Sequence, residues 1–135
     1  MLDYFIATLP HFLSYFTVAI GLAVAFLFLY VQVTPHREIA LIREGNIAAA
    51  VQLTGTFLGF AAPVAIVIGH SVNLVDMLLW GGVAALVQLA VFFVIARLLF
   101  PAISQRIADN CLASGIFVGG IGFGIGILQA ACMVP

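Results

Sequence analysis

Four long apolar runs, separated by short polar and charged clusters, dominate the hydrophobic pattern of this chain. They cover approximately Phe12 to Val33, Ile47 to Ile68, Met77 to Leu99 and Cys111 to Met133. A helix rises about 1.5 Å per residue and the hydrocarbon core of a bilayer is about 30 Å thick, so roughly 20 apolar residues make one crossing. Strands of a membrane barrel would be about ten residues long and alternate in polarity. The pattern therefore predicts an all-α integral membrane protein with four transmembrane helices.

The second and fourth runs resemble each other in their small residues. When Asn46 is placed on Asn110, Gly55 falls on Gly119 at the same offset. This similarity predicts two tandem two-helix repeats, residues 1–69 and residues 70–135.

The connections after the first and third runs carry most of the charge. Thr34 and Pro35 have the features of a helix start, and Gly45 is suited to end that helix in the left-handed conformation. We therefore expect residues 35–44 and 101–108 to form short amphipathic helices on the membrane surface. The charged side chains expected to reach water from the first of them are Arg37, Glu38, Arg43 and Glu44. Asn46 is placed to cap the second span, and Asp109 or Asn110 to cap the fourth.

The first run is rich in Phe and Leu, which predicts a lipid-facing helix. The residues before Phe12 are expected to form a short tail at the outer interface, retained because it lacks the basic segment of a signal peptide. Tyr30 and Gln32 near the far end are expected to meet lipid headgroups.

Composition excludes a soluble domain and predicts an orientation. The chain is 65% hydrophobic and 7% charged, with a mean hydropathy of +1.31, whereas soluble domains carry about 25% charged residues. All basic side chains are arginines at the first and third connections, namely Arg37, Arg43, Arg97 and Arg106. Because positive residues stay in the cytoplasm, both termini should be periplasmic. The relation between the halves is then that of parallel repeats.

Glycines at three- and four-residue spacing form a stripe on the fourth span. Gly115, Gly119, Gly122 and Gly126 lie on one helix face, where a neighbouring helix can approach closely. The partner surface is expected on the second span, at Gly55 and Gly59. The number of small residues exceeds what one bundle requires, so we expect a homo-oligomer.

Few polar residues fall within the predicted hydrocarbon region. They are Gln52, Thr54, Thr56, Gln88 and Gln129. Each needs a partner there, because an unpaired amide in lipid costs several kcal/mol. Two interpretations stay open: hydrogen bonds between helices, or a polar path for a small solute or ion. No Asp, Glu or His lies at mid-membrane, so the pattern does not indicate a proton pump.

The remaining candidates are interfacial. His36, Arg37, Arg43, Arg97 and Arg106 are expected to contact headgroups or dock a partner on the cytoplasmic side, and His36 either senses pH or is simply solvated. Cys111 and Cys132 lie at opposite ends of one span, too far apart to pair. No set of residues predicts a catalytic site, a metal site or a cofactor, and nothing predicts nucleic-acid binding.

Five segments spread over essentially the whole chain carry a resemblance. They are TPHREIALIREGNIAAA, GTFLGF with Pro63 following, WGGVAALVQLAVF with Arg97, PAISQRI and ILQAACM. As a set they resemble the YjfL-type family, small bacterial inner-membrane proteins of unknown function built of a duplicated two-helix unit. The resemblance implies a bacterial inner membrane and suggests association with cytosolic polyamine or peptide-ligase enzymes. It brings no catalytic residues.

Two functions are therefore expected from the sequence. The first is a non-catalytic channel or permease component formed by oligomerisation, with the polar residues facing the path. The second is a membrane anchor or regulatory subunit for a cytosolic enzyme, docked on the two short helices.

Overall fold

A computed structural model describes residues 1–70, 73–99 and 101–133 of the chain. Its elements are α1 (Leu2–Val33), α2 (Glu38–Arg43), α3 (Ile47–His70), α4 (Leu74–Val94), the π-helical turn η1 (Ile95–Leu99), α5 (Ile103–Ala108) and α6 (Leu112–Cys132). Within these described residues, four helices are long and apolar enough to cross a membrane: α1, α3, α4 continued by η1, and α6. The all-helical class and the expected number of helices long and apolar enough to span a membrane are confirmed. Ser71 and Val72, in the connection predicted to face outward, lie outside the described residues.

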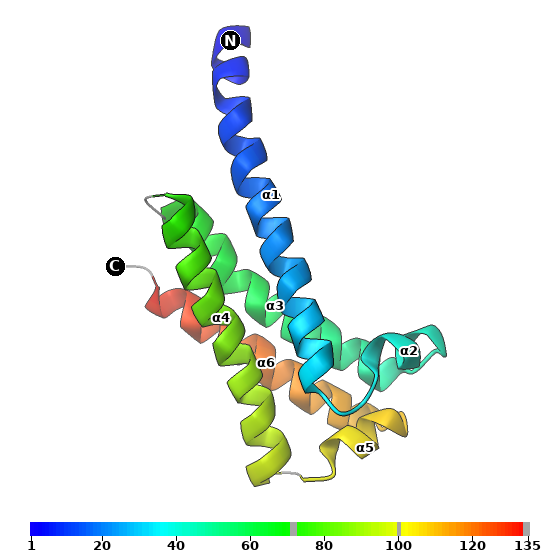
Figure 1. The fold of residues 1–135 in the computed structure, drawn as a ribbon. Coiled ribbons are helices and arrows are strands. Elements are labelled where there is room, and N and C mark those ends of the chain that lie inside the picture. Colours follow the sequence, from blue (N-terminus) through cyan, green and yellow to red (C-terminus); the bar gives the residue numbers. More distant parts are fainter. Residues whose placement is uncertain (71–72, 100, 134–135) are drawn as a thin grey trace.

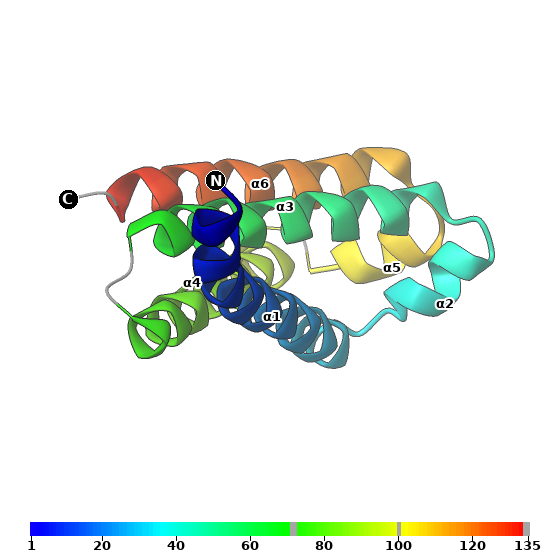
Figure 2. The ribbon, with the colours of Figure 1, turned by 90° about the horizontal axis from the view of Figure 1, so that it is seen from above.

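Helices α3 and α6 lie side by side and run in the same direction (Figures 1 and 2). A Cβ added to a glycine in this contact would overlap the backbone of the other helix. The facing pairs are Ala48 with Gly115, Gly55 with Gly119, and Gly59 with Gly126. Since helices in lipid associate through close van der Waals contact, the absence of side chains at these positions permits the main chains to touch.

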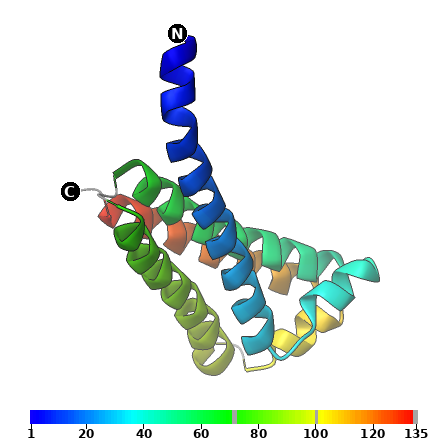
Figure 3. The same ribbon diagram turned by 45° about the horizontal axis from the view of Figure 1, so that its top comes forward.

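Helix α1 packs on α3 and α4 through its C-terminal half, where Leu22 lies against Gly81 of α4. The ring of Phe26 stacks on Phe60 of α3 with centroids 4.3 Å apart, and Phe26 and Tyr30 are the buried residues of α1. The N-terminal half stands away from the bundle (Figure 3). The predicted tail before Phe12 is wrong, because the helix already begins at Leu2. Asp3 lies in the first turn, where a negative charge favours a helix start, and the helix continues through Pro10.

The two short helices lie at the same end of the molecule (Figure 1). Gly45 has a φ of +88° after α2, as expected for a residue that ends a helix in the left-handed region. The starts differ from the prediction: α2 begins at Glu38 and α5 at Ile103. Thr34 caps nothing at an N-terminus, because its hydroxyl donates to the backbone oxygen of Tyr30 at the end of α1.

Two asparagines, Asn46 before α3 and Asn110 before α6, make hydrogen bonds that join the two halves of the chain. Asn46 Oδ1 accepts from the backbone N–H of Ala49 at 2.8 Å, so the predicted cap of α3 is confirmed. Asn110 does not cap α6; its Oδ1 accepts from Ala48 N on α3 at 3.0 Å. The side-chain N–H of Asn46 in turn donates to the backbone oxygen of Ile107 in α5. Asn46 thus ties the start of α3 to α5, and Asn110, just before α6, is tied to the start of α3.

Candidate functional site

A chain of hydrogen-bonded polar side chains runs from the first connection into the space between α1 and α3. His36 Nε2 lies 3.1 Å from Glu38 Oε1 and 2.9 Å from Gln52 Oε1. The Gln52 amide N–H donates to the hydroxyl of Tyr30, and that hydroxyl lies 3.4 Å from Thr56 Oγ1. All five side chains are buried. Helices α1, α2 and α3 and the connection between the first two therefore all contribute to one cluster, which we call the polar chain.

The hydrogen bonds of the polar chain from His36 to Tyr30 have a common direction. Because Gln52 uses its N–H on Tyr30, its Oε1 must accept, so His36 carries a proton on Nε2. The Tyr30 oxygen accepts from Gln52, and either hydroxyl of Tyr30 and Thr56 can donate to the other. Donation thus proceeds from the connection as far as Tyr30.

The polar chain reaches well into the hydrocarbon region. At 1.5 Å per residue, Gln52 lies about 8 Å and Thr56 about 14 Å from the start of α3 at Ile47. Gln88 of α4 lies just beyond, where its N–H donates to the backbone oxygen of Gly122 at 3.0 Å. A Cβ on Gly122 would lie 3.1 Å from Gln88 Oε1 and 3.4 Å from Thr56 Oγ1. Gln88 Oε1 is buried without a hydrogen-bond partner among the described residues.

Burial changes the acid–base properties of the connection. Expectations of a solvated His36 and of a Glu38 reaching water are both wrong, since their exposed fractions are 6% and 0%. The connection folds inward and places both against α3. Burial raises the pKa of Glu38 to about 7, against the opposing effect of nearby Thr34 and Gln52. Burial lowers the pKa of His36, opposed by its hydrogen bond with Gln52.

Aromatic rings enclose the polar chain. The ring of Phe92 on α4 contacts Tyr30 edge-on at 5.8 Å and lies 6.2 Å from the ring of His36. Tyr30 is fully buried, so its predicted place at the headgroups is wrong. The π-helical turn η1 begins at Ile95, three residues after Phe92, and π-helical turns are frequent at functional sites.

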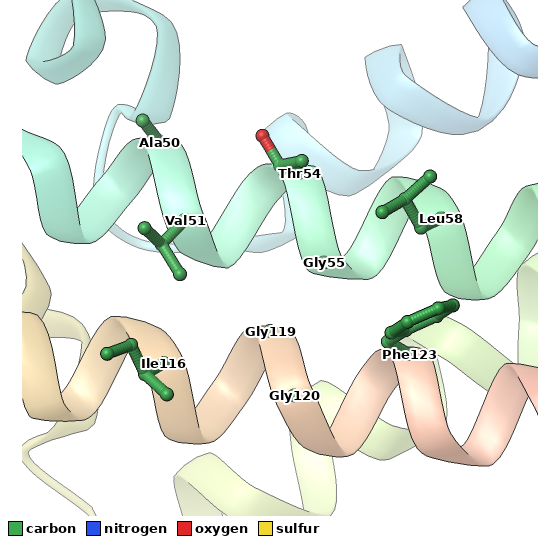
Figure 4. A pocket seen from close by; sticks show the side chains of 9 residues that line it. All are labelled: Ala50, Val51, Thr54, Gly55, Leu58, Ile116, Gly119, Gly120 and Phe123. Atoms are coloured by element: carbon green, nitrogen blue, oxygen red, sulfur yellow. The ribbon is translucent and has the colours of Figure 1, made fainter.

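The other residues predicted for the site lie outside the polar chain. Thr54 is exposed and lines a groove of about 400 Å³ between α3 and α6, beside Gly55, Gly119 and Gly120 (Figure 4). Gln129 is half-buried near the end of α6 and makes no hydrogen bond with the described residues. The arginines predicted to contact headgroups or a partner are exposed: Arg37, Arg43, Arg97 and Arg106.

Sequence reasoning missed two members of the polar chain, Tyr30 and Glu38. A signal was present, since Gln52 in an apolar helix requires polar partners from a neighbouring helix. In chemical terms the cluster can exchange protons at Glu38 and His36 and can hold a polar solute by hydrogen bonds. Across the described residues, no group of three or more His, Cys, Asp or Glu side chains is placed to hold a metal ion. Cys111 and Cys132 are free thiols.

Comparison with known proteins gives a family but no reaction. The model of a domain of unknown function, DUF350, matches residues 4–133. The chain is 38% identical to the UPF0719 inner membrane protein YjfL of Escherichia coli K12, over 90% of this chain and 92% of the relative. It is 30% identical to the UPF0719 transmembrane protein YshE of Bacillus subtilis, over 97% and 98% respectively. No solved structure matches. The chain therefore belongs to the DUF350 family, also called UPF0719, whose function is unknown.

Proposed function

We propose that this protein is a non-catalytic component of a bacterial inner membrane that passes or gates a small polar solute or ion. The polar chain is the observation that carries this proposal. Two relatives of this protein are described as an inner membrane protein and a transmembrane protein, which supports a location in the inner membrane.

The energetics of burial favour a path over simple packing. Apolar contacts already hold these helices together, through glycines between α3 and α6 and through the stacking of Phe26 on Phe60 between α1 and α3. Buried polar groups in hydrocarbon are costly and are usually kept for function. The unpartnered Gln88 Oε1 lies next along the line from Gln52 and Thr56. A polar solute passing this point would find an acceptor there.

The test is solute flux into liposomes containing the purified protein, with protons, potassium ions and urea as probes. Gln52→Leu removes the centre of the polar chain and should reduce the flux by about tenfold, equivalent to roughly 1.4 kcal/mol on a barrier. Thr54→Val is the matched control, because Thr54 lies two residues away on the exposed face. Equal flux in empty liposomes, wild type and both variants would remove the support for this function.

We also propose that the protein is a homo-oligomer. The stripe on α6 that suggested this from sequence faces α3 of the same chain. A different pair, Gly120 and Gly124, lies on the exposed side of α6 with no other atoms close to an added Cβ. Four-residue spacing of glycine on a lipid-facing surface favours helix association. Native mass measurement should show more than one copy, and Gly120→Leu with Gly124→Leu should shift it to one; a wild-type monomer would contradict this part.

Orientation and internal repetition belong to the same proposal. The exposed arginines lie on or beside α2, η1 and α5, and the two short helices lie at one end (Figure 1). That arrangement supports a cytoplasmic location for this end and periplasmic termini. The parallel course of α3 and α6 is the course expected of tandem repeats.

A second function, an anchor or regulatory subunit for a cytosolic enzyme, is favoured by the exposed polar face of the short helices. Its side chains include Arg43, Glu44, Gln105 and Arg106. A photocrosslinker at Glu44 or Gln105 should then capture a protein in the native membrane. Glu38 is unsuited to this experiment, because it is buried. Capture of lipid alone would count against docking.

A further inference from the structure

Glu38 and His36 are ionisable and buried, and Nε2 of His36 lies 3.1 Å from Oε1 of Glu38. They form the end of the polar chain that lies at the connection between α1 and α2. Neither carboxylate oxygen of Glu38 has a well-aligned hydrogen bond with the described residues. A charged carboxylate in that position is poorly compensated, because buried charges require both a partner and hydrogen bonds.

Among the residues that the structure describes, no other charged side chain is buried against the pair. Its neighbours are uncharged. They are Gln52 from α3, the ring of Phe92 from α4 and Thr34 of the connection, with Tyr30 of α1 reached through Gln52. The remaining charged residues at this end are exposed: Arg37, Arg43, Glu44, Arg97, Arg106 and Asp109. With His36 neutral, one proton added to Glu38 makes the whole cluster uncharged.

We propose that Glu38 and His36 form a proton-binding site, and that its occupancy decides whether His36 donates to Glu38 or to Gln52. The proton comes from water at the connection and adds to a carboxylate oxygen of Glu38. An O–H bond forms, and no other bond breaks. His36 stays neutral throughout, with its single Nε2 proton.

Competition for that one Nε2 proton couples the site to helix packing. When Glu38 is charged, its oxygen at 3.1 Å competes with the amide oxygen at 2.9 Å, and bonds to a charged acceptor are about twice as strong. When Glu38 is protonated, this competition ends and His36 donates to Gln52. Gln52 in turn holds Tyr30, so proton binding strengthens the link between α1 and α3.

The acid–base properties agree with this assignment. Burial raises the pKa of Glu38 to about 7 and lowers that of His36. The carboxylate therefore takes up the proton first as pH falls. Proton binding at Glu38 and its effect on α1 do not require any solute to cross the membrane.

The experiment is a pH titration of the full-length protein in lipid nanodiscs, with no flux measured. Infrared difference spectra report the C=O band of a protonated carboxyl, and ¹⁵N resonances report His36 and the side chain of Gln52. In the wild type, a carboxyl should become protonated with a midpoint near pH 7, and both resonances should move with that midpoint. Glu44→Gln, which removes an exposed glutamate of the same connection, should leave all three signals unchanged.

Glu38→Gln should abolish the carboxyl band and fix the Gln52 resonance at its low-pH position. A carboxyl that protonates only near the ordinary value of about 4.5, or a band that survives Glu38→Gln, would overturn the proposal. So would a wild-type His36 that becomes protonated while Glu38 stays charged. Because the wild-type midpoint and the wild-type His36 resonance each decide the proposal without the variant, poor folding of Glu38→Gln leaves the test intact. Failure of the flux assay would not affect it.

Discussion

The side chain of Asn46, at the start of α3, donates hydrogen bonds to the backbone oxygens of Ile107 at 3.0 Å and Ala108 at 3.2 Å in α5. Asn46 also caps α3 through Ala49. Asn46→Ala removes all three bonds. The Ile107 oxygen keeps the N–H of Asn110, whereas the Ala108 oxygen and the Ala49 N–H lose their bonds to Asn46. We expect the free energy of unfolding to fall by about 2–3 kcal/mol, from the loss of a cap and of buried hydrogen bonds. Unfolding in SDS mixed micelles, followed by circular dichroism, measures this.

The control for Asn46 is Asp109→Ala at the end of α5. The Asp109 side chain accepts only an exposed hydrogen bond from Gln105, so its loss should change stability by less than about 0.5 kcal/mol. Equal effects of the two substitutions would mean that Asn46 does not hold the start of α3 to α5.

Two neighbouring glycines of α6 should respond oppositely to alanine. A Cβ on Gly119 would lie 2.7 Å from Val51 O, whereas a Cβ on Gly120 meets nothing within 4 Å. Gly119→Ala must push α3 away and should cost about 1–3 kcal/mol. Gly120→Ala should be neutral or stabilise by up to about 1 kcal/mol, since alanine favours the helix. The same unfolding assay compares them, and a Gly119→Ala protein as stable as Gly120→Ala would contradict the close approach.

Removing the Tyr30 hydroxyl should weaken the attachment of α1. In Tyr30→Phe the Gln52 N–H loses its acceptor and Thr56 loses its neighbour, while the ring stacking of Tyr30 is kept. We expect a loss of about 1–2 kcal/mol, the cost of unpaired buried groups. Hydrogen exchange of the last turns of α1 should accelerate. Tyr4→Phe, on the exposed part of α1, is the control and should leave the exchange unchanged.

Stability should depend on pH through Glu38, and the sign follows from its pKa. The folded protein holds the proton up to about pH 7, whereas the unfolded chain releases it near 4.5. Between these values the folded state binds more protons, so the Glu38 contribution to stability falls as pH rises and is lowest above pH 7. Glu38→Gln should therefore be more stable than wild type at pH 8, by on the order of 3 kcal/mol, and the difference should vanish towards pH 4.5.

His36 acts in the opposite direction below pH 6.5. Its lowered pKa means that acid favours the unfolded chain, which takes up the proton more readily. Comparison of Glu38→Gln with wild type at each pH removes this shared contribution. A difference between them that is independent of pH would show that Glu38 keeps an ordinary pKa.

The spans could be predicted from sequence because bilayer thickness fixes the length of an apolar run. The ends of α3 and α6 fall within a few residues of the expected positions, and Gly45 and Asn46 mark the boundary between α2 and α3 by local chemistry alone. These features depend on neighbours in the chain, so a linear pattern is sufficient to find them.

The polar chain could not be predicted in full, because it depends on how the connection at residues 34–37 folds back. A Tyr and a Glu at the end of an apolar run are normally found near headgroups, and only the fold reveals that Tyr30 and Glu38 are covered by α3 and α4. The place of Thr54 was within reach of the sequence. Residues two apart on a helix do not share a face, so Thr54 could not accompany Gln52 and Thr56.

The length of α1 makes the protein responsive to its lipid environment. At 32 residues α1 is about 48 Å long, while the hydrocarbon core measures about 30 Å. The helix must lean, or its first turns must leave the hydrocarbon, and a change in membrane thickness alters the balance. Helix α1 is held at Phe26 and Tyr30, and its N-terminal half is free. A thinner bilayer therefore tilts this free half relative to the attached end, where Tyr30 belongs to the polar chain.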